Sequence, residues 1–311
     1  MKQVVSVSLG STTRDHETTV ELYHQEIHVS RRGTDGDMER AMVMLRDLDN
    51  QVDAIGLGGI DRYLVVNGQR YEILDAKRLA ECATITPVVD GSGVKAVWEY
   101  RVINHLIEDK IIGPHQKVLL VSALDRFGMA QAFYEQGFPT IAGDLIFSSH
   151  IDYPVTSLAE LQKLARRLLP EMAKMPFTML YPTGREQEQQ SHDSTYHHYF
   201  AEADIVAGDF HFIRHHLPDH LSGKLIITNT TTEEDRRLLK DRGLSILITT
   251  TPVLAGRSFG TNVIEAAIVA ATGVLPDDER WENTVLGAGL HYSITRLDSS
   301  SGIENQGEPT S

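Results

Sequence analysis

Residues 117–147 read KVLLVSALDRFGMAQAFYEQGFPTIAGDLIF, and the fold that we expect for the chain follows from this stretch. Four consecutive apolar residues at 118–121 are typical of a parallel strand that is buried on both faces. Apolar residues then recur at helical spacing until Gly137, and a second strand is expected at 140–147. This order of strand, turn, helix and strand predicts one βαβ unit of a parallel sheet.

The same unit has features of a dinucleotide-binding site. In such sites the pyrophosphate lies on the helix N-terminus, and an acidic residue about 20 positions further on binds the ribose hydroxyls. Asp144 lies 22 positions after Ser122 and fits the ribose position. The turn reads SALDRFG, so only Gly128 of the usual glycines is present. Because Asp125 would repel an anion unless Arg126 offsets it, a βαβ unit that binds no nucleotide is the alternative.

Similar patterns of strand and helix extend in both directions from this unit. Further strands are predicted at 3–9, 19–30, 52–59, 86–89, 177–181, 204–209, 224–228 and 245–249. A hairpin is expected at 62–73, with its turn at Asn67-Gly68. We therefore predict an α/β fold, with a Rossmann-like doubly wound parallel sheet and an N-terminal α/β substrate domain.

The length of 311 residues is enough for two domains with separate cores. We expect an N-terminal substrate domain at 1–108 and a Rossmann-like dinucleotide-binding domain at 109–275, whose last helix returns to the substrate cleft. A C-terminal extension would follow at 276–311. The segment 184–196 is polar and is predicted to be a mobile loop, and the tail after about residue 298 is predicted to be disordered.

Composition and charge exclude several classes of partner. The net charge of −14, with 43 acidic and 29 basic residues, opposes binding to nucleic acid or to anionic lipid surfaces. No apolar run approaches the length of a membrane span, and the N-terminus lacks the pattern of a signal peptide. Cys82 is the only cysteine, as is common in a reducing compartment. We expect a cytoplasmic protein with a small-molecule substrate, no nucleic acid and no membrane, and with a homodimer as an option.

The order of parts along the chain resembles a known enzyme family. Residues 88–93 read VVDGSG and precede a predicted helix and the βαβ unit, and residues 260–267 read GTNVIEAA. The arrangement is similar to the shikimate and quinate dehydrogenases. Those proteins carry an N-T-D-G-x-G segment before an NAD(P)-binding Rossmann domain, and a C-terminal helix that packs on the substrate cleft. The resemblance covers residues 1–275, with Val88 and Val89 in place of the asparagine and threonine.

The resemblance implies that Asp90 orients the substrate hydroxyl together with a lysine that acts as general acid and base. Lys95 is one candidate, because its place in the first helical turn, where the helix dipole disfavours a cation, is explained if it pairs with Asp90. Lys77 is the other, since it lies nearer to where the family keeps its lysine. From the residues alone, Asp90 is either at a ligand site at a strand end or an Asx turn or helix cap. Both lysines are otherwise surface amines.

Further residues are predicted to bind the substrate or the cofactor. Ser6 and Ser8 share one face of a strand and could bind one carboxylate, as a serine pair does in the family. Asn262 and Glu265 correspond loosely to polar positions of the family's closing helix. The residues expected to bind the cofactor are Ser122, Asp125, Arg126, Gly128, Asp144, Asp209 and Thr249. No metal site is expected, because Pro218 interrupts the helical spacing of His216 and His220.

The leading hypothesis is an NAD-dependent dehydrogenase that acts on the secondary hydroxyl of a small alicyclic hydroxy acid, quinate or shikimate by resemblance. Asp144 favours NAD over NADP as the cofactor, because a carboxylate there would repel a 2′-phosphate. Two alternatives stay open. One is a transferase that uses another nucleotide-like cofactor such as S-adenosylmethionine, and the other is a non-catalytic two-domain ligand-binding protein.

Overall fold

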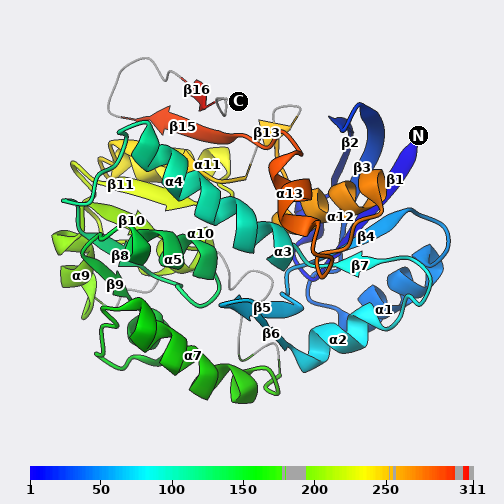
Figure 1. The fold of residues 1–311 in the computed structure, drawn as a ribbon, viewed down its shortest axis with the longest axis horizontal. Coiled ribbons are helices and arrows are strands. Elements are labelled where there is room, and N and C mark those ends of the chain that lie inside the picture. The colour runs from blue at the N-terminus through cyan, green and yellow to red at the C-terminus, as the bar shows by residue number, and fades with distance from the viewer. Residues whose placement is uncertain (177–178, 180–193, 252, 255–256, 298–303, 308–311) are drawn as a thin grey trace. The chain divides into compact units, whose positions relative to one another are not determined.

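The computed structural model describes residues 1–176, 179, 194–251, 253–254, 257–297 and 304–307 (Figure 1). The chain divides into two compact units, each with its own mainly parallel sheet. The first unit comprises Met1–Val97, Arg166–Gln187 and Leu254–Leu290, and the second comprises Trp98–Ala165, Glu188–Val253 and His291–Ser311. The predicted α/β class with a Rossmann-like parallel sheet is confirmed.

The division of the chain differs from the predicted boundaries at 108 and 275. The first unit ends at Val97, and residues 254–290 return to it instead of ending the second unit. Residues 184–193 of the loop predicted at 184–196, and most of the strand predicted at 177–181, lie outside the described residues. Residues 304–307 form a strand in place of the expected disordered tail, and the rest of that tail also lies outside the described residues.

The first unit is built on a five-stranded sheet in the order β2-β3-β1-β4-β7. Its strands are β1 (Lys2–Ser8), β2 (His16–Leu22), β3 (Gln25–Gly33), β4 (Ala54–Gly58) and β7 (Val88–Val89). All neighbours are parallel except β2 and β3. The strand predicted at 19–30 is in fact this antiparallel pair, because Tyr23 and His24 adopt positive φ angles of 52° and 58° and turn the chain.

A separate hairpin and several helices complete the first unit. The hairpin pairs β5 (Tyr63–Val66) with β6 (Gln69–Glu72). Its turn at Asn67-Gly68 has φ angles of 51° and 75°, as the Asn-Gly pair predicts. The helices are α1 (Met38–Leu48), α2 (Leu74–Ala80), α3 (Ser92–Val94), α12 (Thr261–Thr272) and α13 (Trp281–Leu286).

The C-terminal helix α12 packs on the sheet of the first unit. It lies against β1, β3 and β4, and its residues 263–270 are buried (Figure 1). Glycines allow this approach, because a Cβ at Gly56 would lie 2.8 Å from the Asn262 carbonyl oxygen. At Gly91, which has a φ of +90°, a Cβ would lie 2.5 Å from the Asn262 nitrogen. The glycines of the VVDGSG segment therefore serve helix packing.

The second unit carries a seven-stranded sheet in the order β16-β15-β12-β11-β10-β8-β9. Its strands are β8 (Val118–Leu120), β9 (Thr140–Ala142), β10 (Ile205–Ala207), β11 (Leu225–Thr228), β12 (Ile246–Thr249), β15 (Tyr292–Arg296) and β16 (Glu304–Gly307). The five strands β8 to β12 are parallel, and their order in the sheet, β9-β8-β10-β11-β12, is the 2-1-3-4-5 order of doubly wound folds. The strands predicted at 204–209, 224–228 and 245–249 are thus confirmed.

Helices connect the parallel strands of the second unit. They are α4 (Tyr100–Glu108), α5 (Phe127–Glu135), α6 (Asp144–Ser149), α9 (His197–Glu202), α10 (Phe210–His215) and α11 (Glu233–Asp241), while α7 (Leu158–Met172) contributes to both units. The apolar run at 118–121 is buried, as expected of a central parallel strand. Among the described residues, no helix is long and apolar enough to cross a membrane.

The packing of α12 predicts that Gly91 tolerates a side chain less well than another left-handed glycine of the first unit. Gly91→Ala should lower the free energy of unfolding, because a left-handed alanine costs roughly 1–2 kcal/mol and the overlap with α12 adds about 1–3 kcal/mol. Gly68→Ala is the matched control, since its φ is +75° but no atom lies within 4 Å of its Cβ position. Urea unfolding of both variants measures the difference. Equal losses would show that α12 does not restrict position 91.

Candidate functional site

The turn predicted to bind pyrophosphate is occupied by the chain's own carboxylate. The strand predicted at 140–147 ends at Ala142, and Asp144 is instead the first residue of α6. Its two oxygens accept hydrogen bonds from the amides of Ala123, at 3.1 Å, and Leu124, at 2.9 Å. Burial raises the pKa of Asp144 to about 6. The amides that would hold a phosphate in a dinucleotide site therefore already have an acceptor.

Arg126 is likewise engaged by acidic residues of the same unit. It is buried, and its guanidinium pairs with Glu99, with Asp209 at 2.7 Å and with Asp125 at 3.1 Å. The predicted offset of Asp125 by Arg126 is therefore present. Asp209 also accepts a hydrogen bond from Asn229 at 2.8 Å. These carboxylates leave Arg126 poorly placed to neutralise a bound phosphate as well.

The other predicted cofactor residues have structural contacts or lie within elements. The Ser122 hydroxyl accepts a hydrogen bond from the Asp209 amide at 3.0 Å. Gly128 lies in α5, and Thr249 is the buried last residue of β12. Burial lowers the pKa of His216 to about 4. In the described part of the chain, no group of three or more histidine, cysteine, aspartate or glutamate residues is arranged to hold a metal ion.

Asp90 is buried and both of its oxygens are hydrogen-bonded. One oxygen accepts from the amides of Arg62, at 2.6 Å, and Tyr63, at 2.9 Å. The other accepts from the Ser92 hydroxyl at 2.7 Å and from the Ser92 amide at 3.2 Å. The sequence alternative of an Asx turn or cap describes these contacts. Asp90 joins the start of β5 to the start of α3.

Glu265 ties α12 to the same segment. Its two oxygens accept hydrogen bonds from the amides of Gly91, at 3.1 Å, and Val94, at 2.7 Å. The side chain is buried, and burial together with the charge of Asp90 raises the pKa of Glu265 to about 8. The two amides favour the ionised form and partly oppose this shift. Glu265 was predicted to bind substrate, and here it supports the backbone.

The predicted lysines and serines each have a partner elsewhere in the first unit. Lys95 pairs with Asp61 at 2.6 Å, a partner that the sequence analysis did not single out. Lys77 lies in α2, within 4 Å of Glu72 and Glu81. The remaining predicted side chains have partners of their own within the first unit. Ser6 accepts from Asn262 at 2.7 Å, and Ser8 accepts from Arg31 at 3.0 Å.

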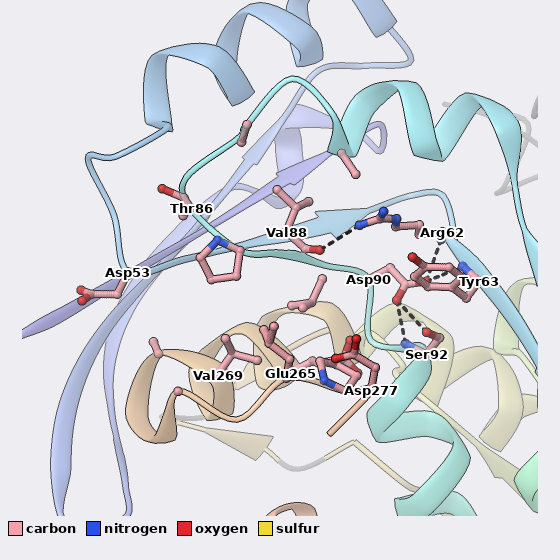
Figure 2. Close-up of a pocket in the computed structure, with 18 of the residues that line it drawn as sticks. Asp53, Arg62, Tyr63, Thr86, Val88, Asp90, Ser92, Glu265, Val269 and Asp277 are labelled. Atoms are coloured by element: carbon pink, nitrogen blue, oxygen red, sulfur yellow. Dashed lines mark hydrogen bonds between the residues drawn. The ribbon is translucent and has the colours of Figure 1, made fainter. Parts of the chain in front are cut away.

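One pocket of about 930 Å³ lies in the first unit, beside Asp90 and Glu265. Its wall is formed by residues 83–90, by the β5–β6 hairpin and by the end of α12 with the loop that follows it. Figure 2 shows Asp90, Ser92, Glu265 and Asp277 toward one end of the pocket and Asp53 and Thr86 toward the other. Apolar side chains such as Val88 and Val269 lie between them.

Sequence reasoning missed three residues of this wall: Arg62, Tyr63 and Arg70. Both guanidinium groups lie over the Tyr63 ring, at 5.0 Å for Arg62 and 5.2 Å for Arg70. They are adjacent because the tight turn at Asn67-Gly68 folds β6 back on β5. The sequence does show Arg62 and Tyr63 before the Asn-Gly turn and Arg70 after it, and this pattern could have indicated that the three side chains lie close together. What could not be read was that the hairpin would face α12.

The wall segment at 84–86 is held by Asp49, the residue that ends α1. Its carboxylate accepts hydrogen bonds from the Thr84, Ile85 and Thr86 amides at 2.8, 2.9 and 2.8 Å and from the Thr84 hydroxyl at 3.0 Å. These hydrogen bonds hold the pKa of Asp49 well below its usual value, and the bond from the Thr84 amide has the largest effect. The bonded segment leads directly into β7 and fixes that side of the pocket.

Comparison with known proteins places the chain among families without an assigned activity. Residues 93–297 match the family described as "Domain of unknown function (DUF8754)", and residues 3–90 match "Domain of unknown function (DUF8753)". No curated protein matches the chain.

The chain has weak similarity to several solved structures. A galactofuranose binding protein shares 10% identity at a TM-score of 0.37, over 93% of this chain and 98% of that one. A protein described as a malic enzyme (malate oxidoreductase) shares 12% sequence identity at a TM-score of 0.36, over 96% of this chain and 85% of that one. The periplasmic binding protein of the arabinose ABC transporter from Shewanella sp. ANA-3 shares 11% sequence identity at a TM-score of 0.36, over 89% of this chain and 87% of that one. Likenesses this weak do not indicate a function.

The prediction of an NAD(P)-dependent dehydrogenase is wrong. The geometry gives the physical reason, because Asp144 occupies the turn amides and Arg126 is engaged by carboxylates. The transferase alternative relied on the same acidic residue as a ribose ligand. Binding of NAD itself stays a prediction from the sequence alone.

The raised pKa of Glu265 predicts a pH dependence of stability. The folded protein holds this proton up to about pH 8, whereas an ordinary glutamate loses it near 4.5. The free energy of unfolding should therefore fall as pH rises between these values. In Glu265→Gln the fall between pH 5 and 8 should be smaller than in the wild type, by on the order of 1 kcal/mol or more. Urea unfolding at both pH values measures this, with the exposed Glu282→Gln as control; equal slopes in all three proteins would contradict the raised pKa.

The contacts of Asp49 predict local loosening of the pocket wall. Asp49→Ala removes the acceptor for three amides, so hydrogen exchange at 84–86 should become at least about tenfold faster without global unfolding. Asp47→Ala, an exposed position in the same helix, should leave exchange unchanged. Mass-spectrometric hydrogen exchange resolves the segment. Slow exchange in both variants would mean that other contacts hold the wall.

Proposed function

Because the chain belongs to the family described as Domain of unknown function (DUF8754), whose description names no activity, we propose a function from its own pocket. We propose that the protein is a non-catalytic, two-domain ligand-binding protein that holds a small polar organic molecule reversibly in the pocket of its first unit. The pocket volume of about 930 Å³ lies in the range of small-molecule sites, about 300–1,000 Å³.

The proposal depends mainly on the hydrogen bonds that the two buried carboxylates, Asp90 and Glu265, accept from the protein itself. Asp90 and Glu265 are the acids nearest to a predicted catalytic role, and the oxygens of both accept backbone or hydroxyl hydrogen bonds. A general base needs an oxygen within reach of the proton that it removes. Here the oxygens hold the β5 start, the α3 start and α12 together. The acids therefore shape a binding site and are poorly placed for proton transfer.

The composition of the wall supports a polar ligand of modest size. Charged groups of both signs line the pocket, including Arg62, Arg70 and Asp277, together with apolar surface from Val88 and Leu275. Binding sites for small organic molecules combine an apolar lining with a few placed polar groups. A wholly apolar ligand would leave these charges desolvated without partners, at a cost in affinity.

The location of binding provides the test. Wild-type protein should be screened by thermal shift with a panel of small sugars, organic acids, amides and amines, with NAD included. A bound compound should raise the melting temperature, since it binds only the folded state. Hydrogen exchange with that compound should slow in 62–73, 84–92 and 269–277.

The second unit supplies the internal control for this experiment. Exchange at 205–207 and 225–228, in β10 and β11, should not change when the ligand binds. Protection confined to the second unit would place the site there and reject the pocket. Conversion of the compound on prolonged incubation, followed by NMR, would reject the non-catalytic part of the proposal.

A further inference from the structure

Arg70 differs from the other arginine of the pocket in what neutralises it. Arg62 forms an ion pair with Glu72 at 2.8 Å and also donates to it through Nε at 2.9 Å. Arg70 forms no ion pair with any residue in the described part of the chain, and its charge acts only at longer range on Glu265, where it partly opposes the rise in pKa that burial causes. It is half-buried at the pocket wall. A half-buried guanidinium without a carboxylate partner retains the capacity to bind an external anion.

The guanidinium of Arg70 is held in place before any ligand arrives. It lies 5.2 Å from the centre of the Tyr63 ring, and its Nη2 donates to the Pro276 carbonyl oxygen at 2.6 Å. Its backbone is fixed in β6, where Arg70 pairs with Val65 of β5. An arginine that is already immobilised loses little side-chain freedom on binding. Of its five N–H donors, the contact with Pro276 uses one.

The surroundings of Arg70 favour a planar anion with one charge. Asp90 and Asp277 also line the pocket, and their carboxylates would repel a dianion such as a phosphate monoester. A carboxylate matches the planar fork of a guanidinium and carries a single charge. Asp277 follows Pro276 directly, is exposed, and accepts no hydrogen bond from a described residue. It is free to accept one from a hydroxyl or ammonium group of the ligand.

We infer that the ligand carries a carboxylate, which Arg70 binds, together with hydrogen-bond donors that face Asp277. This inference rests on the proposed function of the pocket and adds the chemical class of its ligand. It assigns Arg70 as the residue that determines specificity for an acid over its neutral counterpart. Arg62 has a different task, because its pairing with Glu72 holds the hairpin in shape.

Matched pairs of probes test the inference on the full chain. The pairs are D-glucuronate with D-glucose, D-galacturonate with D-galactose, and succinate with succinamide, since each pair differs in the acid group. Titration calorimetry should show the acid of at least one pair binding at least about tenfold more tightly than its neutral partner. Arg70→Gln should weaken the acid by about 10- to 100-fold, as expected for charge-assisted hydrogen bonds. The neutral partner should be little affected.

Two further variants separate charge from geometry. Arg70→Lys keeps the charge but loses the planar fork, so the acid should still bind about tenfold more weakly than to the wild type. Arg78→Gln is the matched control on α2, since Arg78 is exposed and does not line the pocket. Circular dichroism and the urea midpoint check that each variant is folded.

The outcomes distinguish this inference from the function on which it rests. Neutral probes that bind as tightly as their acids, or acids that bind Arg70→Gln as well as the wild type, would overturn the carboxylate assignment and leave the pocket as a binding site. Absence of binding by every probe, together with absence of any hit in the wider panel, would overturn both. Acid binding that is lost equally in Arg78→Gln would show a general charge effect and would also overturn the assignment.

Discussion

The two hydrogen bonds of the Glu265 carboxylate hold together parts of the first unit that are far apart in the chain. They join α12 to Gly91, which lies 174 positions earlier, and to Val94. Closing so long a connection is entropically unfavourable, so the contact depends on the apolar burial of α12 against the sheet. Once α12 is seated, its end and the loop after it face the edge strand β7, and the pocket exists. The glycines of the sheet edge are needed because α12 approaches their backbone so closely.

The second unit uses carboxylates in the same internal way, with a different result. Asp144 satisfies the turn after β8, and Asp209 pairs with Arg126 where β8 and β10 end. This edge is where doubly wound sheets usually bind ligands. Because the Ala123 and Leu124 amides and the Arg126 guanidinium already have acceptors within the chain, this part of the edge is occupied by the protein's own carboxylates. At this edge of the sheet the carboxylates of Asp144 and Asp209 therefore have a structural role, and the fold by itself does not indicate a function.

The contrast between Arg62 and Arg70 shows how small differences in pairing define a binding site. Both arginines lie over Tyr63, yet among the described residues only Arg62 forms an ion pair with a carboxylate. Glu72 lies directly opposite Tyr63 in the hairpin, whereas Val65 lies opposite Arg70. The charge of Arg62 is therefore neutralised by Glu72. Arg70 presents a positive charge to a pocket that is otherwise rich in acids.

The sequence by itself determined the α/β class and most strands of the second unit, because an apolar run that is buried on both faces can be recognised locally. It also identified the Asn67-Gly68 turn. Only the tertiary structure decided what Asp90, Asp144 and Glu265 do. The role of a carboxylate depends on which donors lie within about 3 Å of it. Except for Ser92, which donates to Asp90, the donors to these three carboxylates lie 20 or more positions away, such as Leu124 for Asp144. Local patterns do not contain that distance, so the sequence could not show that these three carboxylates accept hydrogen bonds from backbone amides.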